Sequence, residues 1–269
     1  MPDTYRIDDI DLHAVARGNG TPIVLLHGFP LDHTMWNAQT EASAERCQVI
    51  VPDQRGFGRS PLGTHTLTIE RLADDLAALL DAMHSRERAI VCGLSMGGYV
   101  ALVFHRKYAT RVRALILCDT RADADTQAGV ADRMALIERV RATGPTAVVE
   151  AMLPKLVAAA AFEQQPQVVE DVRRMMLATP PATLEAALRA LATRPDSTEH
   201  LTHIDVPTLT VVGEHDAITP VEVMTAMADA IPKCQRAVIR GAGHMSPMER
   251  PAEFNTALVE FLKKPGVLA

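Results

Sequence analysis

A serine flanked by glycines two residues away on each side lies in the stretch Gly93-Leu94-Ser95-Met96-Gly97. An apolar run precedes this stretch and an amphipathic pattern follows it, which predicts a sharp turn from a strand into a helix. Such a turn strains the serine backbone and projects the hydroxyl above the sheet, and larger side chains in place of the glycines would collide. Ser95 is therefore predicted to be a nucleophile.

A histidine and an aspartate are placed to activate that serine. A serine hydroxyl is a weak nucleophile at neutral pH until an imidazole accepts its proton. His244 follows the last apolar run of the chain, and Asp216 follows the run before it. We predict that His244 is the base, and that Asp216 holds it in the correct tautomer and stabilises its cation without taking the proton.

Two alternatives to these assignments were weighed. His215 lies in a suitable loop, but it adjoins Asp216 and cannot easily swing between Asp216 and Ser95. Seven of the other histidines lie outside the loops where this chemistry would assemble. Asp119 follows the apolar run 114–117 and stays open as the alternative acid.

Backbone amides near Ser95 could stabilise an oxyanion. The stretch His27-Gly28-Phe29-Pro30 directly follows the apolar run 23–26. The amides of Phe29 and Met96 are the predicted donors, and two fixed donors of this kind can each contribute about 10²–10³ in rate. His27 is expected to support the loop rather than to transfer protons.

Strand and helix patterns alternate along most of the chain. The apolar runs suit strands covered on both faces, so we predict an α/β fold with a mostly parallel sheet of about eight strands and helices on both faces. The strand candidates are 23–26, 48–51, 89–92, 114–117, 208–212 and 236–239. The helix candidates are 68–83, 96–108 and 252–262.

The alternation stops between about residues 121 and 200. This stretch is rich in Ala, Leu and Met, and one crossover connection needs far fewer residues. It predicts a helical lid over 121–200, inserted between two parts of the α/β core at 1–120 and 201–269. Breaks are expected at Gly144-Pro145, Pro154, Pro166 and Pro180-Pro181.

Composition argues against several classes of function. The net charge is −6 with no run of Lys or Arg, which disfavours nucleic acid as a partner. No apolar run reaches the roughly 20 residues of a membrane span. Four scattered cysteines show neither metal-ligand nor disulfide spacing, and no Gly-x-Gly-x-x-Gly opens a helix. We expect a cytoplasmic protein without metal or cofactor, and the oligomeric state stays open.

Taken together, these motifs resemble the α/β-hydrolase superfamily over nearly the whole chain. The matching stretches are 27–30, 53–60, the turn at Ser95, 213–216 and 243–244, in the family's order of serine, acid and histidine. More narrowly, the chain resembles small-lidded carboxylesterases and 3-oxoadipate enol-lactonase-like hydrolases. Some relatives recruit their acid from the position of Asp119. Dehalogenases and epoxide hydrolases of this fold use Asp at the turn, which Ser95 disfavours.

The resemblance implies a serine hydrolase that cleaves a small carboxylic ester or lactone through an acyl-enzyme. Trp36 and Arg121 are the candidate pocket residues, and Arg121 could anchor an anion. No other basic anchor is evident, so an uncharged or weakly charged substrate with an apolar part is expected. The same triad would also suit a cofactor-free lyase, a C–C hydrolase or a perhydrolase. A non-catalytic ligand-binding receptor on this fold is the alternative from another class.

Overall fold

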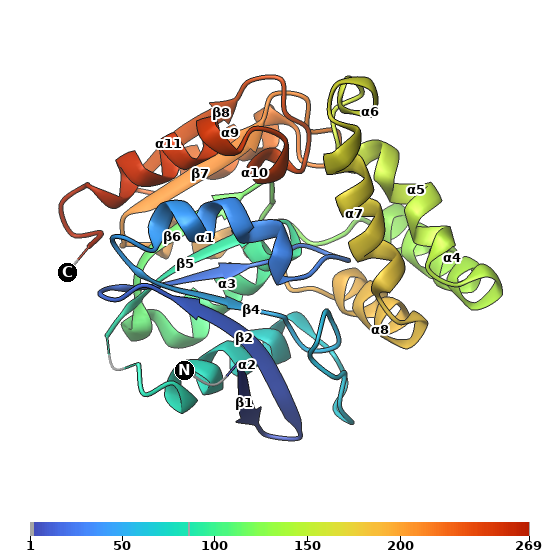
Figure 1. The fold of residues 1–269 in the computed structure, drawn as a ribbon, viewed down its shortest axis with the longest axis horizontal. Coiled ribbons are helices and arrows are strands. Elements are labelled where there is room, and N and C mark those ends of the chain that lie inside the picture. Colours follow the sequence, from blue (N-terminus) through green and yellow to red (C-terminus); the bar gives the residue numbers. More distant parts are fainter. Residues whose placement is uncertain (1–2, 86, 269) are drawn as a thin grey trace.

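The computed structural model describes residues 3–85 and 87–268. Within these residues, eight strands form one sheet in the order β1-β2-β4-β3-β5-β6-β7-β8 (Figure 1). From β4 through β3 to β8 all neighbours are parallel, whereas β2 pairs antiparallel with β1 and β4. The predicted α/β fold is confirmed. The strands are β1 (Thr4–Ile7), β2 (Ile10–Arg17), β3 (Pro22–Leu26), β4 (Gln48–Pro52), β5 (Ala89–Leu94), β6 (Val112–Cys118), β7 (Thr208–Gly213) and β8 (Cys234–Ile239).

The central strands are buried along their whole length. Every residue of β3, β5 and β7 is buried, as expected for strands with helices on both faces. All six strand candidates coincide with β3 to β8. The hairpin of β1 and β2 was not predicted, because its residues alternate between buried and exposed over a short span and form no apolar run.

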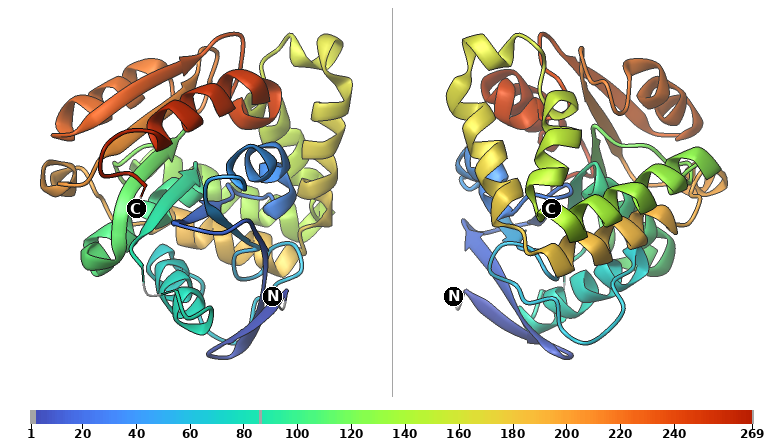
Figure 2. Two further views of the ribbon diagram at one scale, coloured as in Figure 1. Left: turned by 60° about the vertical axis from the view of Figure 1, so that its left-hand side comes forward. Right: turned by 90° about the vertical axis from the view of Figure 1, so that its right-hand side faces the viewer.

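Helices cover both faces of the sheet. Helix α1 (Asn37–Ser43) packs with α11 (Pro251–Leu262) on one face, while α2 (Ile69–Ala82) and α3 (Met96–Tyr108) pack together on the other (Figures 1 and 2). The three helix candidates match α2, α3 and α11 to within a residue or two. Two further helices follow the last strands, α9 (Val221–Ala230) and the short α10 (Ser246–Glu249).

Five helices lie between β6 and β7 and stand together at one end of the sheet, on the right of Figure 1. We call this segment the helical insertion. Gly144 ends its first helix with a positive φ of 69°, and prolines begin its last two helices, as predicted. The break predicted at Pro154 does not occur there. Pro154 lies inside a helix that ends two residues later. The helices are α4 (Gln127–Thr143), α5 (Thr146–Leu156), α6 (Ala161–Gln164), α7 (Pro166–Ala178) and α8 (Pro181–Ala192).

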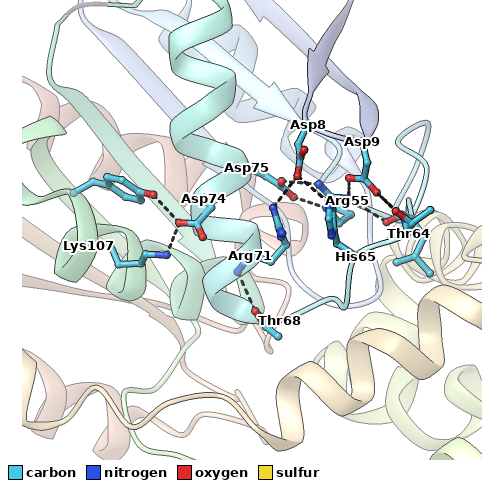
Figure 3. A network of polar contacts seen from close by, with 12 residues as sticks. Asp8, Asp9, Arg55, Thr64, His65, Thr68, Arg71, Asp74, Asp75 and Lys107 are labelled. Atoms are coloured by element: carbon cyan, nitrogen blue, oxygen red, sulfur yellow. Dashed lines mark hydrogen bonds and ion pairs between the residues drawn. The ribbon is translucent and has the colours of Figure 1, made fainter.

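A buried arginine ties the N-terminal hairpin to the rest of the core (Figure 3). The Arg55 guanidinium donates to both oxygens of Asp75 on α2, at 2.7 and 2.8 Å, and to Asp9 in the β1–β2 turn at 2.6 Å. Asp9 in turn accepts from the amide of Thr64. Breaking a buried ion pair of this kind leaves an uncompensated charge, so the network fixes the glycine-rich loop after β4.

Neither a membrane-spanning helix nor a disulfide occurs in the part of the chain that the structure describes. Among the described helices, none is long and apolar enough to cross a bilayer. The four cysteines are free thiols, and three of them are buried. Cys92 and Cys118 come within 3.8 Å of each other through their sulfur atoms, on neighbouring strands β5 and β6.

Candidate active site

Ser95 lies at the turn between β5 and α3 that its sequence context predicts. Its backbone has φ 53° and ψ −112°, a conformation that is unusual and costly for a residue with a side chain. The flanking glycines are required by close approach of the backbone. A Cβ on Gly93 would lie 2.1 Å from the Gly97 carbonyl oxygen, and a Cβ on Gly97 would lie 2.3 Å from that of Leu26. The turn therefore presents a half-buried hydroxyl at the end of a central strand.

His244 and Asp216 form a buried pair at the ends of β8 and β7. The His244 Nδ1 atom donates to Asp216 Oδ2 at 2.8 Å, and both side chains are at most 1% exposed. Asp216 also accepts from the amides of Ile218 and Thr219 and from the Thr219 hydroxyl, at 2.5 to 2.9 Å. Burial alone would raise the pKa of Asp216, but the bonds from His244 and Thr219 hold it below its ordinary value. The acid is thus kept ionised beside the imidazole.

Asp119, the alternative acid, lies beside this pair but is engaged elsewhere. Its carboxylate accepts from the amide of Gly213 at 2.7 Å and from the hydroxyl of Ser246 at 2.5 Å. One of its carboxylate oxygens lies within 4.8 Å of an oxygen of Asp216 and of a ring nitrogen of His244. Burial, reinforced by the Asp216 charge, raises the pKa of Asp119 well above its ordinary value. Of the two carboxylates, the one that hydrogen-bonds His244 is Asp216.

The Phe29 and Met96 amides lie on neighbouring loops. Residues Leu26 and Gly93 are paired across β3 and β5, so the loops that follow them start side by side. A Cβ on Gly28 would be only 3.4 Å from the Ser95 Cβ, which shows how closely the loops approach. Met96 begins α3, where amides have no acceptor within the helix. In the described part of the chain, neither amide donates to another protein group.

His27 supports the loop after β3, as its position predicts. Its Nε2 accepts from the Gln54 amide at 3.0 Å, so Nδ1 carries the proton and donates to the Gly28 carbonyl at 2.9 Å. The Gln54 side chain donates back to the His27 carbonyl at 2.7 Å. Burial lowers the pKa of His27, so the ring stays neutral and structural.

Trp36 and Arg121, the two predicted pocket residues, both make contacts within the protein. The Trp36 side chain is fully buried and packs against Phe254 of α11, with ring centroids 6.0 Å apart, because it fills the layer between α1 and α11. The Arg121 guanidinium is half-covered and makes two bonds of 2.7 and 2.6 Å to the Asp123 carboxylate. The first side chain is inaccessible and the second already has an anionic partner.

A groove of about 640 Å³ runs between α4 and α5 of the insertion. Its lining combines apolar and charged side chains. The larger apolar ones are Leu136, Met152, Leu188 and Ile218, and the charged ones are Asp125, Asp132, Arg133, Arg139 and Lys155. The amide of Ile218 is one of the donors to Asp216. The groove therefore reaches the loop that carries the acid, a feature that the sequence analysis missed because its residues come from separate helices.

Three clusters of the described residues have the spacing of metal ligands, and one of them is Asp119, Asp216 and His244 themselves. In a second cluster, the Asp53 carboxylate accepts from both imidazoles of His13 and His33 and from the amides of His33 and Arg59. Despite burial, the bonds from His33 and Arg59 lower the pKa of Asp53 to about 2. Four N–H donors already surround this carboxylate, so its contacts are those of a structural network. The third cluster, Asp8, Asp9 and His65, lies in the more exposed network of Figure 3. We assign no metal or cofactor to any of the three.

Comparison with known proteins places these features in context. A family model described as the alpha/beta hydrolase fold matches residues 21–251. The chain is similar to a thermophilic esterase from Thermogutta terrifontis, solved with malate bound, at a TM-score of 0.94 and 44% identity over 99% of this chain and 98% of that one. It is similar to the enol-lactonase from Burkholderia xenovorans LB400 at a TM-score of 0.90 and 28% identity, over 97% and 100% of the two chains. A 3-oxoadipate enol-lactonase from Acinetobacter baylyi is 29% identical over 91% of this chain and 90% of its own length.

Proposed function

The chain belongs to the alpha/beta hydrolase fold family, and from that premise we propose that it is a serine hydrolase of small carboxylic esters or lactones. The observation that carries this proposal is the buried His244–Asp216 pair at the same sheet edge as the strained turn of Ser95. Esterases and enol-lactonases among the similar proteins support the choice of bond.

The proposed reaction starts at Ser95. Because Nδ1 of His244 is held by Asp216, its Nε2 is the atom left to take the serine proton as Oγ attacks the carbonyl carbon. The amides of Phe29 and Met96 stabilise the oxyanion. His244 then protonates the leaving alkoxide, which leaves an acyl-enzyme on Ser95. Water, activated by the same histidine, releases the acid and restores the serine.

We propose that the helical insertion, residues 121–200, acts as a lid over this site. Two of its hydroxyl groups reach loops that follow core strands. Thr179 donates to the Pro30 carbonyl at 3.3 Å, next to the proposed oxyanion donor Phe29, and Thr183 donates to the Gly56 carbonyl at 2.9 Å. These contacts hold the start of α8 against the edge of the sheet where Ser95 lies.

The proposed substrate is uncharged or weakly charged with an apolar part. Part of the groove between α4 and α5 is apolar, where Leu136, Met152 and Leu188 lie with Ile218 of the acid loop, and this part suits an aliphatic acyl or alcohol group. Arg121, the basic anchor considered for an anionic substrate, is paired with Asp123 and does not line this groove. We also keep two predictions from composition, a cytoplasmic location and small molecules rather than nucleic acid as partners.

A substrate panel combined with active-site labelling tests the proposal. The panel holds p-nitrophenyl esters of increasing acyl length, neutral lactones and an anionic enol-lactone, and a fluorophosphonate labels reactive serines. We expect turnover of short and medium esters, one label on Ser95, and loss of both in Ser95→Ala with unchanged circular dichroism. An unlabelled Ser95, together with an Ala variant that keeps wild-type turnover, would mean that the serine hydrolase assignment is wrong.

Product analysis separates the other reactions that the same triad would support. Cyanohydrins, diketones, and acetate with peroxide probe a lyase, a C–C hydrolase and a perhydrolase respectively. Selective turnover of one of these, with esters and lactones untouched, would replace the proposed reaction. Tight binding of a panel compound without any turnover would instead indicate a receptor.

A further inference from the structure

The segment of the insertion that follows α5 lies directly on the loop that carries His244. The amide of Met245 donates to the Leu156 carbonyl at 2.9 Å, which joins the residue after the histidine to the end of α5. On the other side of the histidine, a Cβ on Gly243 would lie 2.4 Å from the Ala158 nitrogen. The two backbones are therefore in contact on both sides of His244.

One buried carboxylate joins these two segments. Glu249 ends α10 and is 3% exposed. Its Oε1 accepts from the amide of Gly243 at 2.9 Å, and its Oε2 accepts from the amide of Ala158 at 2.8 Å. Gly243 precedes His244 in the chain, whereas Ala158 belongs to the insertion, 91 residues away from Glu249.

The chemistry of this contact requires an acid of this length. Both partners are N–H donors, and each bonds a different oxygen of the carboxylate. An amide side chain would present an NH₂ donor to one of them. Burial raises the pKa of Glu249, against the lowering effect of the Ala158 and Gly243 amides. An ionisable group that is costly to bury is retained here although an apolar side chain would fill the same space. Its position indicates a role that packing alone does not explain.

We propose that Glu249 is a positioning residue that locks the insertion onto the His244 loop, so that attachment of the insertion and placement of the base depend on one carboxylate. The part that concerns catalysis rests on the proposed function above. Loss of the bridge frees Gly243 and Ala158 together, which displaces the imidazole and loosens the insertion at its junction with the core. A shift of about 1 Å in a reacting group can cost about a hundredfold in rate.

Hydrogen exchange measured by mass spectrometry tests the bridge without any substrate. The variant Glu249→Gln replaces one acceptor with a donor that faces an N–H group. We expect faster exchange in two separate peptides, one covering residues 153–162 and one covering residues 238–247. Acceleration in only one of the two peptides, or in neither, contradicts the coupling, and this result stands even if the protein hydrolyses no ester.

Kinetics test the catalytic part. In Glu249→Gln we expect kcat to fall at least about tenfold for short and long acyl esters alike, because every substrate uses His244, and KM to rise for the long ones. Glu249→Asp keeps the charge but is one methylene too short to reach both donors, so it should behave like the Gln variant. Wild-type kinetics in Glu249→Asp, or an unchanged kcat in Glu249→Gln, would overturn the proposal.

Two further variants complete the test: a control, and a substitute in case Glu249→Gln does not fold. Glu253→Gln is the matched control, since Glu253 is an exposed carboxylate whose hydrogen bond is to the Arg240 amide, outside the insertion. It should match the wild type in exchange and kinetics. If Glu249→Gln does not fold, Gly243→Ala takes its place. Its new Cβ would lie 2.4 Å from the Ala158 nitrogen, so it should accelerate hydrogen exchange in the same two peptides. Faster hydrogen exchange in residues 238–247 alone would again contradict the proposed bridge.

Discussion

The Nδ1 atom of His244 lies 2.8 Å from Oδ2 of Asp216, with both side chains sealed from solvent. His244 lies in the loop after β8 and Asp216 in the loop after β7. These strands are neighbours in the sheet, so the two loops lie side by side. In a buried setting such a bond fixes the ring orientation and the position of its second nitrogen. The catalytic consequences of this arrangement can be tested one residue at a time.

Asp216→Asn should lower kcat by about 10³–10⁴ while the fold is retained. An amide at this position offers a donor or a neutral acceptor to Nδ1, so the imidazole loses its preferred tautomer and the support for its cation. Steady-state kinetics with a p-nitrophenyl ester measure the loss, and circular dichroism verifies the fold. Near wild-type turnover in this variant would show that another group orients His244.

Asp119→Asn should keep activity within about threefold and increase stability toward alkaline pH. The raised pKa of Asp119 means that the folded state retains a proton that the unfolded chain loses above about pH 4. The free energy of unfolding of the wild type therefore falls as the pH rises, and a neutral amide at this position removes that loss. Thermal melts from pH 4 to pH 8 should show a growing advantage for the variant. Loss of turnover in Asp119→Asn with survival of Asp216→Asn would exchange the roles of the two acids.

Gly28→Ala should lower kcat by about 10²–10³ with little change in KM. The new Cβ would lie 2.8 Å from the Leu94 side chain and 3.4 Å from the Ser95 Cβ, which displaces the loop that holds the Phe29 amide. Gly144→Ala is the control, because a Cβ there meets nothing within 4 Å, although its positive φ costs some stability. Equal kinetics in the two variants would argue against Phe29 as an oxyanion donor.

Arg121→Gln should leave kcat/KM for neutral esters within about twofold. The guanidinium is already paired with Asp123, so its removal affects the start of the insertion more than the substrate. The informative comparison is with an anionic enol-lactone on the same variant. A tenfold rise in KM for the anion alone would restore Arg121 as an anchor and shift the proposed substrate class.

Asp53 should contribute acid-sensitive stability. Its pKa of about 2 in the folded state is below the unfolded value of about 3.9, so its contribution is complete above about pH 5 and is lost as the pH falls toward 2. The shift corresponds to about 2 to 3 kcal/mol. Urea unfolding of the wild type and Asp53→Asn between pH 3 and pH 7 should give stability curves that converge on acidification. Parallel curves would show that Asp53 is not held ionised by His33 and the Arg59 amide.

Local patterns in the sequence were enough to predict the framework of the site. The turn at Ser95 is specified by two glycines, an apolar strand and an amphipathic helix, all within about twenty residues, and its geometry is the one predicted. The central parallel strands could be predicted equally well, because strands buried on both faces consist of unbroken apolar runs. The β1–β2 hairpin was missed, since exposed polar residues interrupt its buried ones and its contact with Arg55 spans 46 positions.

Contacts between distant segments needed the tertiary structure. The packing of Trp36 against Phe254 and the pairing of Arg121 with Asp123 could not be predicted from the sequence. Asp119 and Asp216 both follow strands, and which of them reaches His244 depends on distances between loops. Glu249 carries no local signal for its partner 91 residues away. Residue types and near-neighbour spacing determine which chemistry is available, whereas hydrogen bonds and burial form only when the chain brings remote segments together, and these decide which groups meet.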